Sequence, residues 1–142
     1  MPTTSAEENK AIVRRVIEEL WNKGNLAVID ELYAADFVRD DPATPGVPGG
    51  PDSEKQVATM YRSAFPDLRL TIEGMIAEGD QVALRWTSTG THRGDLQGLA
   101  PTGKSIQTSG ITILRFANGK VVEECARWDT LGLMQQLGAI PG

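Results

Sequence analysis

The first 65 residues repeat apolar side chains three and four positions apart, which is the period of an α-helix. The pattern predicts three helices, over Ser5–Gly24, Asn25–Tyr33 and Ser53–Phe65. Ser5 with Glu8, and Ser53 with Gln56, have the capping-box spacing that marks a helix start. Residues 41–51 hold many prolines and glycines, so we expect a loop between the second and third helices.

From residue 68 onward the pattern changes to runs rich in β-branched residues, which predicts strands. The four runs are Leu68–Ala77, Gln81–His92, Ser105–Phe116 and Lys120–Trp128. Tight turns at 78–80 and 118–119 join neighbouring runs, so the last three strands or so form an antiparallel meander. A short helix over 131–137 closes the chain. Helices followed by a twisted antiparallel sheet predict an α+β fold, in which the curved sheet can enclose a cavity.

Composition narrows the set of partners. The 142 residues fit one domain, 1–142, and the net charge of -5 repels phosphate backbones and anionic lipid. No apolar run approaches the ~20 residues that cross a bilayer. We therefore expect neither a nucleic acid nor a membrane partner, and a cytoplasmic location. One cysteine, Cys125, and one histidine, His92, exclude an internal disulfide and a Cys/His-rich metal site.

The segment Gly98–Ser105 satisfies the phosphate-loop expression letter by letter. A phosphate loop must open a helix, whose N-terminal amides bind the phosphates. Residues 106–114 instead have the pattern of a strand. We therefore do not expect nucleotide binding.

The end of the last predicted strand carries a candidate catalytic carboxylate, Asp129. Alternation places Cys125, Arg127 and Asp129 on one strand face, and Val122, Glu124, Ala126 and Trp128 on the other. Partial burial beside Trp128 would raise the pKa of Asp129 toward the range of a general base. The residues alone slightly favour the other interpretation, a helix cap, since Asp129 directly precedes the final helix. Arg127 is either a binder of substrate oxygens or part of a structural ion pair.

Further candidates are more ambiguous. His92 is a proton shuttle, a ligand-orienting donor or a structural residue, and the structural interpretation is favoured because no partner signature accompanies it. Asp36, Asp40 and Asp41 cluster before Pro42 and allow a second carboxylate at a pocket mouth, although turn chemistry explains them nearly as well. Six aromatic residues belong to the core or to a cavity lining, and they are Trp21, Tyr33, Phe37, Tyr61, Phe65 and Trp86.

Six segments spread over nearly the whole chain match the pattern of a known family. They are Glu19–Asn25, Glu31–Tyr33, Phe65–Leu68, Gly90–Gly94, Gly98–Lys104 and Trp128–Gly138. Together they resemble the SnoaL-like polyketide cyclases, also called ester cyclases. The resemblance implies the cone-shaped fold of the nuclear transport factor 2-like, or cystatin-like, proteins. In that fold a curved antiparallel sheet surrounds a deep apolar pocket, here with the order of three helices, four strands and a short C-terminal helix. It also implies a homodimer or homotetramer.

The resemblance further implies an intramolecular aldol ring closure of a small hydrophobic ester, without metal or organic cofactor. The acid/base carboxylate of the family falls on Asp129. His92, Arg127 or Arg115 would orient the carbonyls. Asp40 stands where relatives often carry a histidine in a Phe-x-x-His-x-Pro context. Two alternatives stay open, which are a non-catalytic protein that binds a small hydrophobic molecule, and an epoxide hydrolase- or isomerase-like activity.

Overall fold

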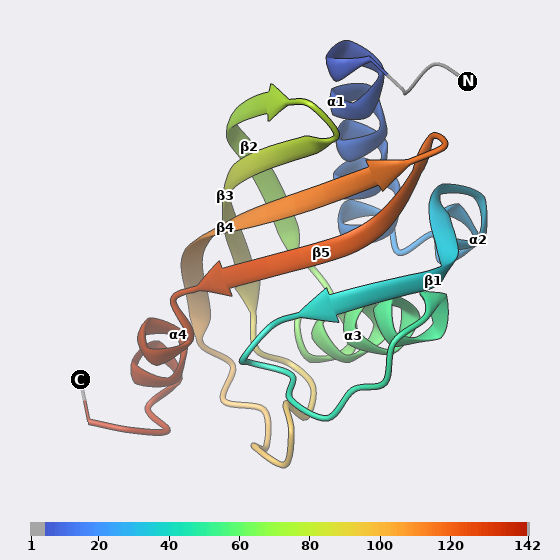
Figure 1. The fold of residues 1–142 in the computed structure, drawn as a ribbon. Helices are drawn as coiled ribbons and strands as arrows, with labels where there is room; N and C mark the ends of the chain where they lie inside the picture. The colour runs from blue at the N-terminus through green and yellow to red at the C-terminus, as the bar shows by residue number, and fades with distance from the viewer. Residues whose placement is uncertain (1–4, 142) are drawn as a thin grey trace.

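The computed structural model describes residues 5–141, in which helices pack against one face of a curved, five-stranded sheet (Figure 1). The helices are α1 (Ala6–Arg15), the π-helical η1 (Val16–Asn22), α2 (Ala27–Leu32), α3 (Pro51–Ala64) and α4 (Thr130–Leu137). The strands are β1 (Tyr33–Asp40), β2 (Arg69–Glu78), β3 (Gln81–Thr91), β4 (Ser105–Ala117) and β5 (Lys120–Trp128). The α+β class is therefore confirmed.

The first predicted helix is confirmed as α1 continued by η1. Ser5 and Glu8 form the expected capping box, and Gly24 ends the helix with a φ of +74°. The π-helical turns carry Val16, Ile17 and Leu20 into the core.

The four expected strands are confirmed as an antiparallel meander, but the sheet has a fifth strand that the sequence pattern did not predict. The strand order is β1-β5-β4-β3-β2, and β1 pairs with β5 in parallel. The expected order of three helices before any strand, and a wholly antiparallel sheet, are therefore wrong. Tyr33 lies four residues after Ile29 and four before Phe37. This spacing fits both a helix and one face of a strand, so periodicity alone did not show where α2 ends.

The third helix begins earlier than its capping pattern predicts. Its N-cap is Gly50 and its first residue is Pro51, which has the φ of a helix start. Ser53 is not the cap, because its hydroxyl donates to the carbonyl of Gly50 at 2.7 Å. The loop expected over 41–51 is confirmed over 41–50, while Pro51 already belongs to α3. The phosphate-loop motif is followed by a strand, as expected, since Ser105 opens β4.

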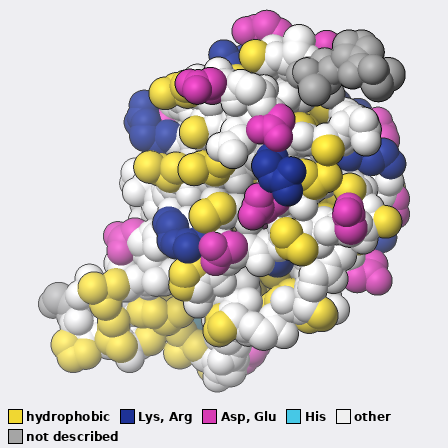
Figure 2. Space-filling view, viewed as in Figure 1, with side chains coloured by type: hydrophobic (Ala, Val, Ile, Leu, Met, Phe, Trp, Pro, Cys, Tyr) yellow, Lys and Arg dark blue, Asp and Glu magenta, His cyan; other side chains and the backbone are white. Residues whose placement is uncertain are grey.

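The outer face of the sheet is exposed and carries charges of both signs, among them the pairs Arg127–Asp40 and Arg115–Glu123 (Figure 2). Hydrophobic side chains gather in the same view over α4 and the C-terminal end, where Leu131 and Ile140 are exposed. Among the helices of residues 5–141, none has the length and apolarity that a bilayer crossing requires.

Polar side chains attach the N-terminal helix to the sheet. The Asn22 amide donates to the Leu70 carbonyl at 3.0 Å and accepts from the Leu70 N–H at 2.7 Å, as a neighbouring strand would. Arg62 of α3 donates to the Trp21 carbonyl at 2.7 Å. The end of η1 is thus fixed against the start of β2, and this contact holds one wall of the pocket in place.

Replacing Asn22 tests this attachment. Asn22→Ala leaves both Leu70 backbone groups without their partners, so we expect a loss of about 1–3 kcal/mol in the free energy of unfolding. The control is Lys23→Ala, because the Lys23 side chain is exposed and should change stability by less than about 0.5 kcal/mol. Urea unfolding measures both variants. Equal stabilities would contradict the prediction.

Candidate active site

A largely apolar pocket lies between the helices and the inner face of the sheet. Its empty space is about 830 Å³, part of which is open to solvent. Val13, Val16 and Ile17 form the wall from α1 and η1, and α3 contributes Val57 and Tyr61. Most of the remaining wall comes from inward-facing side chains of the sheet, and Phe65, Leu68 and Leu133 complete it from outside the strands. A cavity of this kind, apolar with a few polar groups, is the usual form of a small-molecule site.

Two tryptophans meet across a glycine in the middle of the sheet. Trp86 on β3 and Trp128 on β5 are both paired with Gly110 on β4, and their ring centroids are 6.4 Å apart. A Cβ on Gly110 would lie 2.5 Å from the Cβ of Trp128 and 2.6 Å from Cζ2 of Trp86. Only glycine therefore allows this pair. Tyr61 and Trp21 extend the aromatic wall, with ring centroids 5.6 Å from Tyr61 to Trp128 and 6.5 Å from Trp21 to Tyr61.

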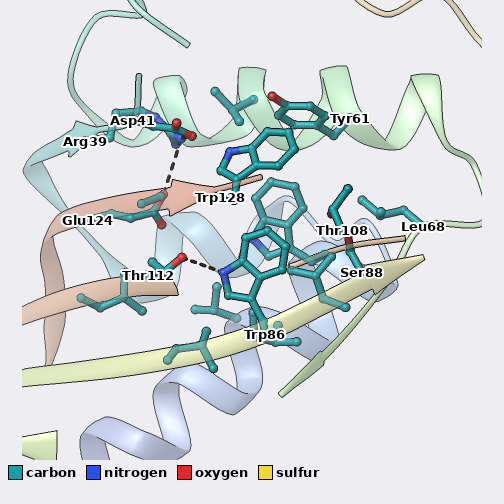
Figure 3. A pocket seen from close by; sticks show the side chains of 18 of the residues that line it. Arg39, Asp41, Tyr61, Leu68, Trp86, Ser88, Thr108, Thr112, Glu124 and Trp128 are labelled. Atoms are coloured by element: carbon teal, nitrogen blue, oxygen red, sulfur yellow. Dashed lines mark hydrogen bonds and ion pairs between the residues drawn. The ribbon is translucent and has the colours of Figure 1, made fainter. Parts of the chain in front are cut away.

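A cluster of charged side chains closes one end of the pocket (Figure 3). The guanidinium of Arg39, from β1, forms ion pairs with Glu54 of α3, with Asp41 at 3.4 Å and with Glu124 of β5 at 3.5 Å. All four side chains are at most 10% exposed. Tyr33 donates from its hydroxyl to Glu54 at 3.0 Å. One cation thus faces three carboxyl groups in a place that water barely reaches.

The excess of carboxyl groups over cations shifts the pKa of Glu124. Burial raises the pKa of the Glu124 carboxyl well above its usual range, the charge of Glu54 raises it further, and the Arg39 guanidinium opposes both. Burial alone would lower the pKa of Arg39, but Glu54, Glu124 and Asp41 together raise it, so Arg39 stays charged. Glu124 is therefore a carboxyl group that holds its proton at a pH where an exposed glutamate has lost it.

Neutral hydroxyl groups supply the remaining polar part of the lining. Thr112 on β4 accepts a hydrogen bond of 3.0 Å from the indole Nε1 of Trp86, which fixes that ring. Ser88 on β3 and Thr108 on β4 lie opposite each other, with their hydroxyl oxygens 2.5 Å apart. Both are buried and face the cavity.

Three of the residues expected to bind substrate line the pocket, namely Trp21, Tyr61 and Trp86. Asp129 does not. Its side chain is exposed at the N-cap of α4 and accepts from the Gly132 N–H at 2.8 Å, which is the cap alternative. The position of Asp129 therefore does not support its assignment as the acid/base group.

Arg127 and Asp40 lie together on the outer face of the sheet, away from the pocket. The Arg127 guanidinium pairs with the Asp40 carboxylate at 3.2 Å and donates to its carbonyl at 3.1 Å. The structural ion pair is thus the interpretation that the geometry bears out for Arg127. Arg115 also faces outward, where it pairs with Glu123 at 2.9 Å.

The other expected ligand contacts are buried parts of the framework. Tyr33 and Phe37 pack edge to face with centroids 4.8 Å apart, outside the pocket lining. His92 is fully buried, and its Nδ1 accepts from the Thr102 N–H at 3.1 Å. Its backbone pairs with Lys104 and Gly103, so His92 fastens the ends of the 93–104 connection. These contacts agree with the structural interpretation of His92.

The sequence reasoning missed Arg39, Glu54 and Glu124. A signal was present for Glu124, because alternation along the last strand placed it on the face of Ala126 and Trp128, and that face is the one that lines the pocket. No comparable signal existed for Arg39, because the strand that carries it was not predicted. Glu54 looked like an ordinary acidic residue in the first turn of a helix.

The raised pKa of Glu124 has a consequence for stability. The folded chain binds this proton more tightly than the unfolded chain does, so the contribution is greatest below a pH of about 4.5 and falls as the pH rises toward the raised pKa. Glu124→Gln has no carboxyl group to ionise, so the variant does not lose stability in this way as the pH rises. We expect a variant that is more stable than the native chain at pH 8, by about 2–4 °C in Tm per 1 kcal/mol regained, with no such gain at pH 4.

Thermal unfolding between pH 4 and pH 8 measures this difference. The matched control is Glu123→Gln, because the neighbouring Glu123 carboxylate is half-exposed on the outer face. A gain in Tm that is the same at every pH, or a Glu124→Gln variant that is less stable at pH 8, would contradict the prediction.

Comparison with known proteins agrees with this architecture. Aklanonic acid methyl ester cyclase AcmA of Streptomyces galilaeus is 30% identical over 137 residues, which cover 92% of this chain and 91% of that protein. Nogalonic acid methyl ester cyclase of Streptomyces nogalater is 26% identical over 119 residues, covering 83% and 89%. The crystal structure of AclR, a candidate hydroxylase from Streptomyces galilaeus, matches with a TM-score of 0.85 and 32% identity, covering 97% of this chain and 85% of that chain.

A family model gives the same assignment. The model described as SnoaL-like polyketide cyclase matches residues 11–137, which include every strand of the sheet and the whole pocket lining. The resemblance inferred from the short sequence segments is therefore confirmed over nearly the full length, and the chain belongs to the SnoaL-like polyketide cyclase family.

Proposed function

We propose that the protein is a cofactor-independent ester cyclase, which closes a ring of an aromatic polyketide ester with Glu124 as the acid/base group. The observation that carries the proposal is the position of Glu124, a buried carboxyl of raised pKa in the wall of an aromatic-lined pocket. Perturbed carboxyl groups in clefts are typical of catalytic acids and bases. Two related cyclases act, by their names, on aklanonic and nogalonic acid methyl esters, which makes such esters the first substrates to test.

Ring closure of this kind is an isomerisation in which one proton moves and no atom is lost. The ionised Glu124 takes the proton from the carbon next to the ester, and the resulting enolate carbon attacks a carbonyl carbon of the same molecule. The carbonyl oxygen becomes an alkoxide and receives the proton back from Glu124. A raised pKa makes the ionised carboxylate a stronger base for the first transfer, and the alkoxide is basic enough to take the proton back from Glu124 in the second.

The rest of the site supports these steps. Trp86 and Trp128 offer flat faces against which a fused-ring substrate stacks. Arg39 opposes the rise in the pKa of Glu124, and it provides positive charge beside this carboxyl group. The apolar wall excludes water, which would otherwise compete for the proton. The chain is 32% identical to the candidate hydroxylase AclR and 30% identical to the cyclase AcmA, so relatedness alone does not select the reaction. The groups in the pocket have to select it.

A non-catalytic role in binding a small hydrophobic molecule is the second candidate function. It is favoured by the position of Asp129, which caps α4 and is not among the residues that line the pocket. In that case the buried charges would only shape the end of the cavity. Turnover measurements separate the two functions.

Two variants test the assignment of the acid/base group. Glu124→Gln keeps the shape of the side chain and removes its basic oxygen, so we expect ring closure to fall about 10²- to 10⁴-fold. Asp129→Asn still caps α4 and should change the rate by less than about threefold. Chromatography measures conversion of aklanonic acid methyl ester to a product of equal mass. A large loss in Asp129→Asn together with an active Glu124→Gln would reverse the assignment.

The pH dependence of ring closure should report the environment of Glu124. Because the base must be ionised, kcat/KM rises as the pH passes the raised pKa of Glu124. Glu54→Gln removes a negative charge that raises this pKa, so the rise should move to lower pH. Asp52→Asn, at an exposed position on the same helix, is the control. A rise that stays in place or moves to higher pH in Glu54→Gln would contradict the role of Glu54.

A further inference from the structure

We infer that Ser88 and Thr108 form a second polar subsite of the pocket, which binds an acceptor oxygen such as a ketone carbonyl at the end of the ligand far from Glu124. The inference deepens the proposed function and rests on it for the identity of the ligand-binding pocket. It does not require the ring-closing reaction itself.

The two hydroxyl groups lie in an apolar part of the lining. Ser88 pairs with Thr108 on one side and with Leu70 on the other, so the three form a row across β3, β4 and β2. Ser88 and Thr108 are each 6% exposed, and both line the cavity. Leu68 and Ile106 complete the surroundings. A polar pair in such a place has to find its hydrogen bonds within the pocket.

One hydroxyl proton of this pair is not used in a hydrogen bond to the described protein residues. Two hydroxyls hold two protons, and the bond between the oxygens of Ser88 and Thr108 uses one of them. Within residues 5–141, neither hydroxyl makes another hydrogen bond to the protein. The second proton therefore lacks an acceptor among the protein groups, and a ligand oxygen can provide one. Leaving a buried donor unpaired costs free energy, so a ligand with a matching acceptor binds more tightly than one without it.

Two other polar groups of the lining, Thr112 and Arg39, are already engaged. The Thr112 oxygen accepts from the indole of Trp86. The terminal nitrogens of Arg39 face Glu54, Asp41 and Glu124. Ser88 and Thr108 thus offer a donor that no charged neighbour claims.

The position of the pair sets the shape of the ligand. Figure 3 shows Ser88 and Thr108 at one end of the pocket and Glu124 with Arg39 and Asp41 at the other, with the tryptophans between them. Thr108 is six residues along β4 from Leu114, the partner of Glu124, which corresponds to about 20 Å of strand. The fitting ligand is therefore elongated, aromatic in its middle and polar at both ends.

Matched ligands test the subsite directly. We would use 2-acetylanthracene, which carries a terminal ketone, and 2-ethylanthracene, which has nearly the same shape without the oxygen. Quenching of tryptophan fluorescence reports binding, because all three tryptophans of the chain line the pocket. The variants are Thr108→Val, which keeps the side-chain shape, and Ser88→Ala. Thr89→Val and Ser109→Ala make the same chemical changes at exposed positions of the same two strands.

The expected result is a loss of about five- to tenfold in affinity for the ketone in Thr108→Val and in Ser88→Ala, with the affinity for the hydrocarbon unchanged. Thr89→Val and Ser109→Ala should bind both ligands as the native chain does. Equal losses for both ligands, or no loss for the ketone, would overturn the inference. If Ser88→Ala does not fold, Thr108→Val decides.

The test separates this inference from the proposed reaction. Glu124→Gln should keep the preference for the ketone while it loses ring closure. A native chain that prefers the ketone but turns over no ester would support the subsite and count against the cyclase. A chain that turns over the ester but shows no ketone preference would overturn the subsite and leave the cyclase in place.

Discussion

The buried guanidinium of Arg39 is the interaction on which the site depends. Arg39 connects β1 to Glu54 of α3 and to Glu124 of β5, so it joins three elements that are distant in the sequence. Burying three carboxyl groups without a cation would cost several kcal/mol for each ionised group. With one cation for three carboxyls, the compensation is incomplete. The incomplete compensation leaves the pKa of Glu124 raised, and this raised pKa suits the residue to acid/base chemistry.

A second constraint is steric, and it lies in the middle of the sheet. Gly110 has no side chain, and this allows Trp86 and Trp128 to approach each other over β4. The indoles then divide the cavity into a charged end and a hydroxyl end. The same residue that weakens the strand by its backbone freedom therefore creates the aromatic middle of the pocket.

Local patterns predicted most elements of the fold, since period and capping depend on nearby residues alone. The first helix, the four strands after residue 68 and the final helix are confirmed. The prediction failed at β1, where the spacing of Ile29, Tyr33 and Phe37 fits a helix and a strand equally well. This strand pairs with β5, and the paired residues Asp40 and Cys125 lie more than 80 positions apart in the sequence. No local signal reports such a distant partner.

The sequence by itself determined that the last strand has two faces, and it assigned Glu124 and Asp129 to opposite ones. It could not determine which face is enclosed, because alternation treats both faces alike. Only the tertiary structure decided this, through α1, η1 and α3, which cover the face of Glu124 and leave Arg127 to pair with Asp40 outside. Asp129, beyond the end of the strand, satisfies an N–H group of α4 instead. A carboxyl group gains an unusual pKa from burial and neighbouring charge, and both come from residues far away in the chain.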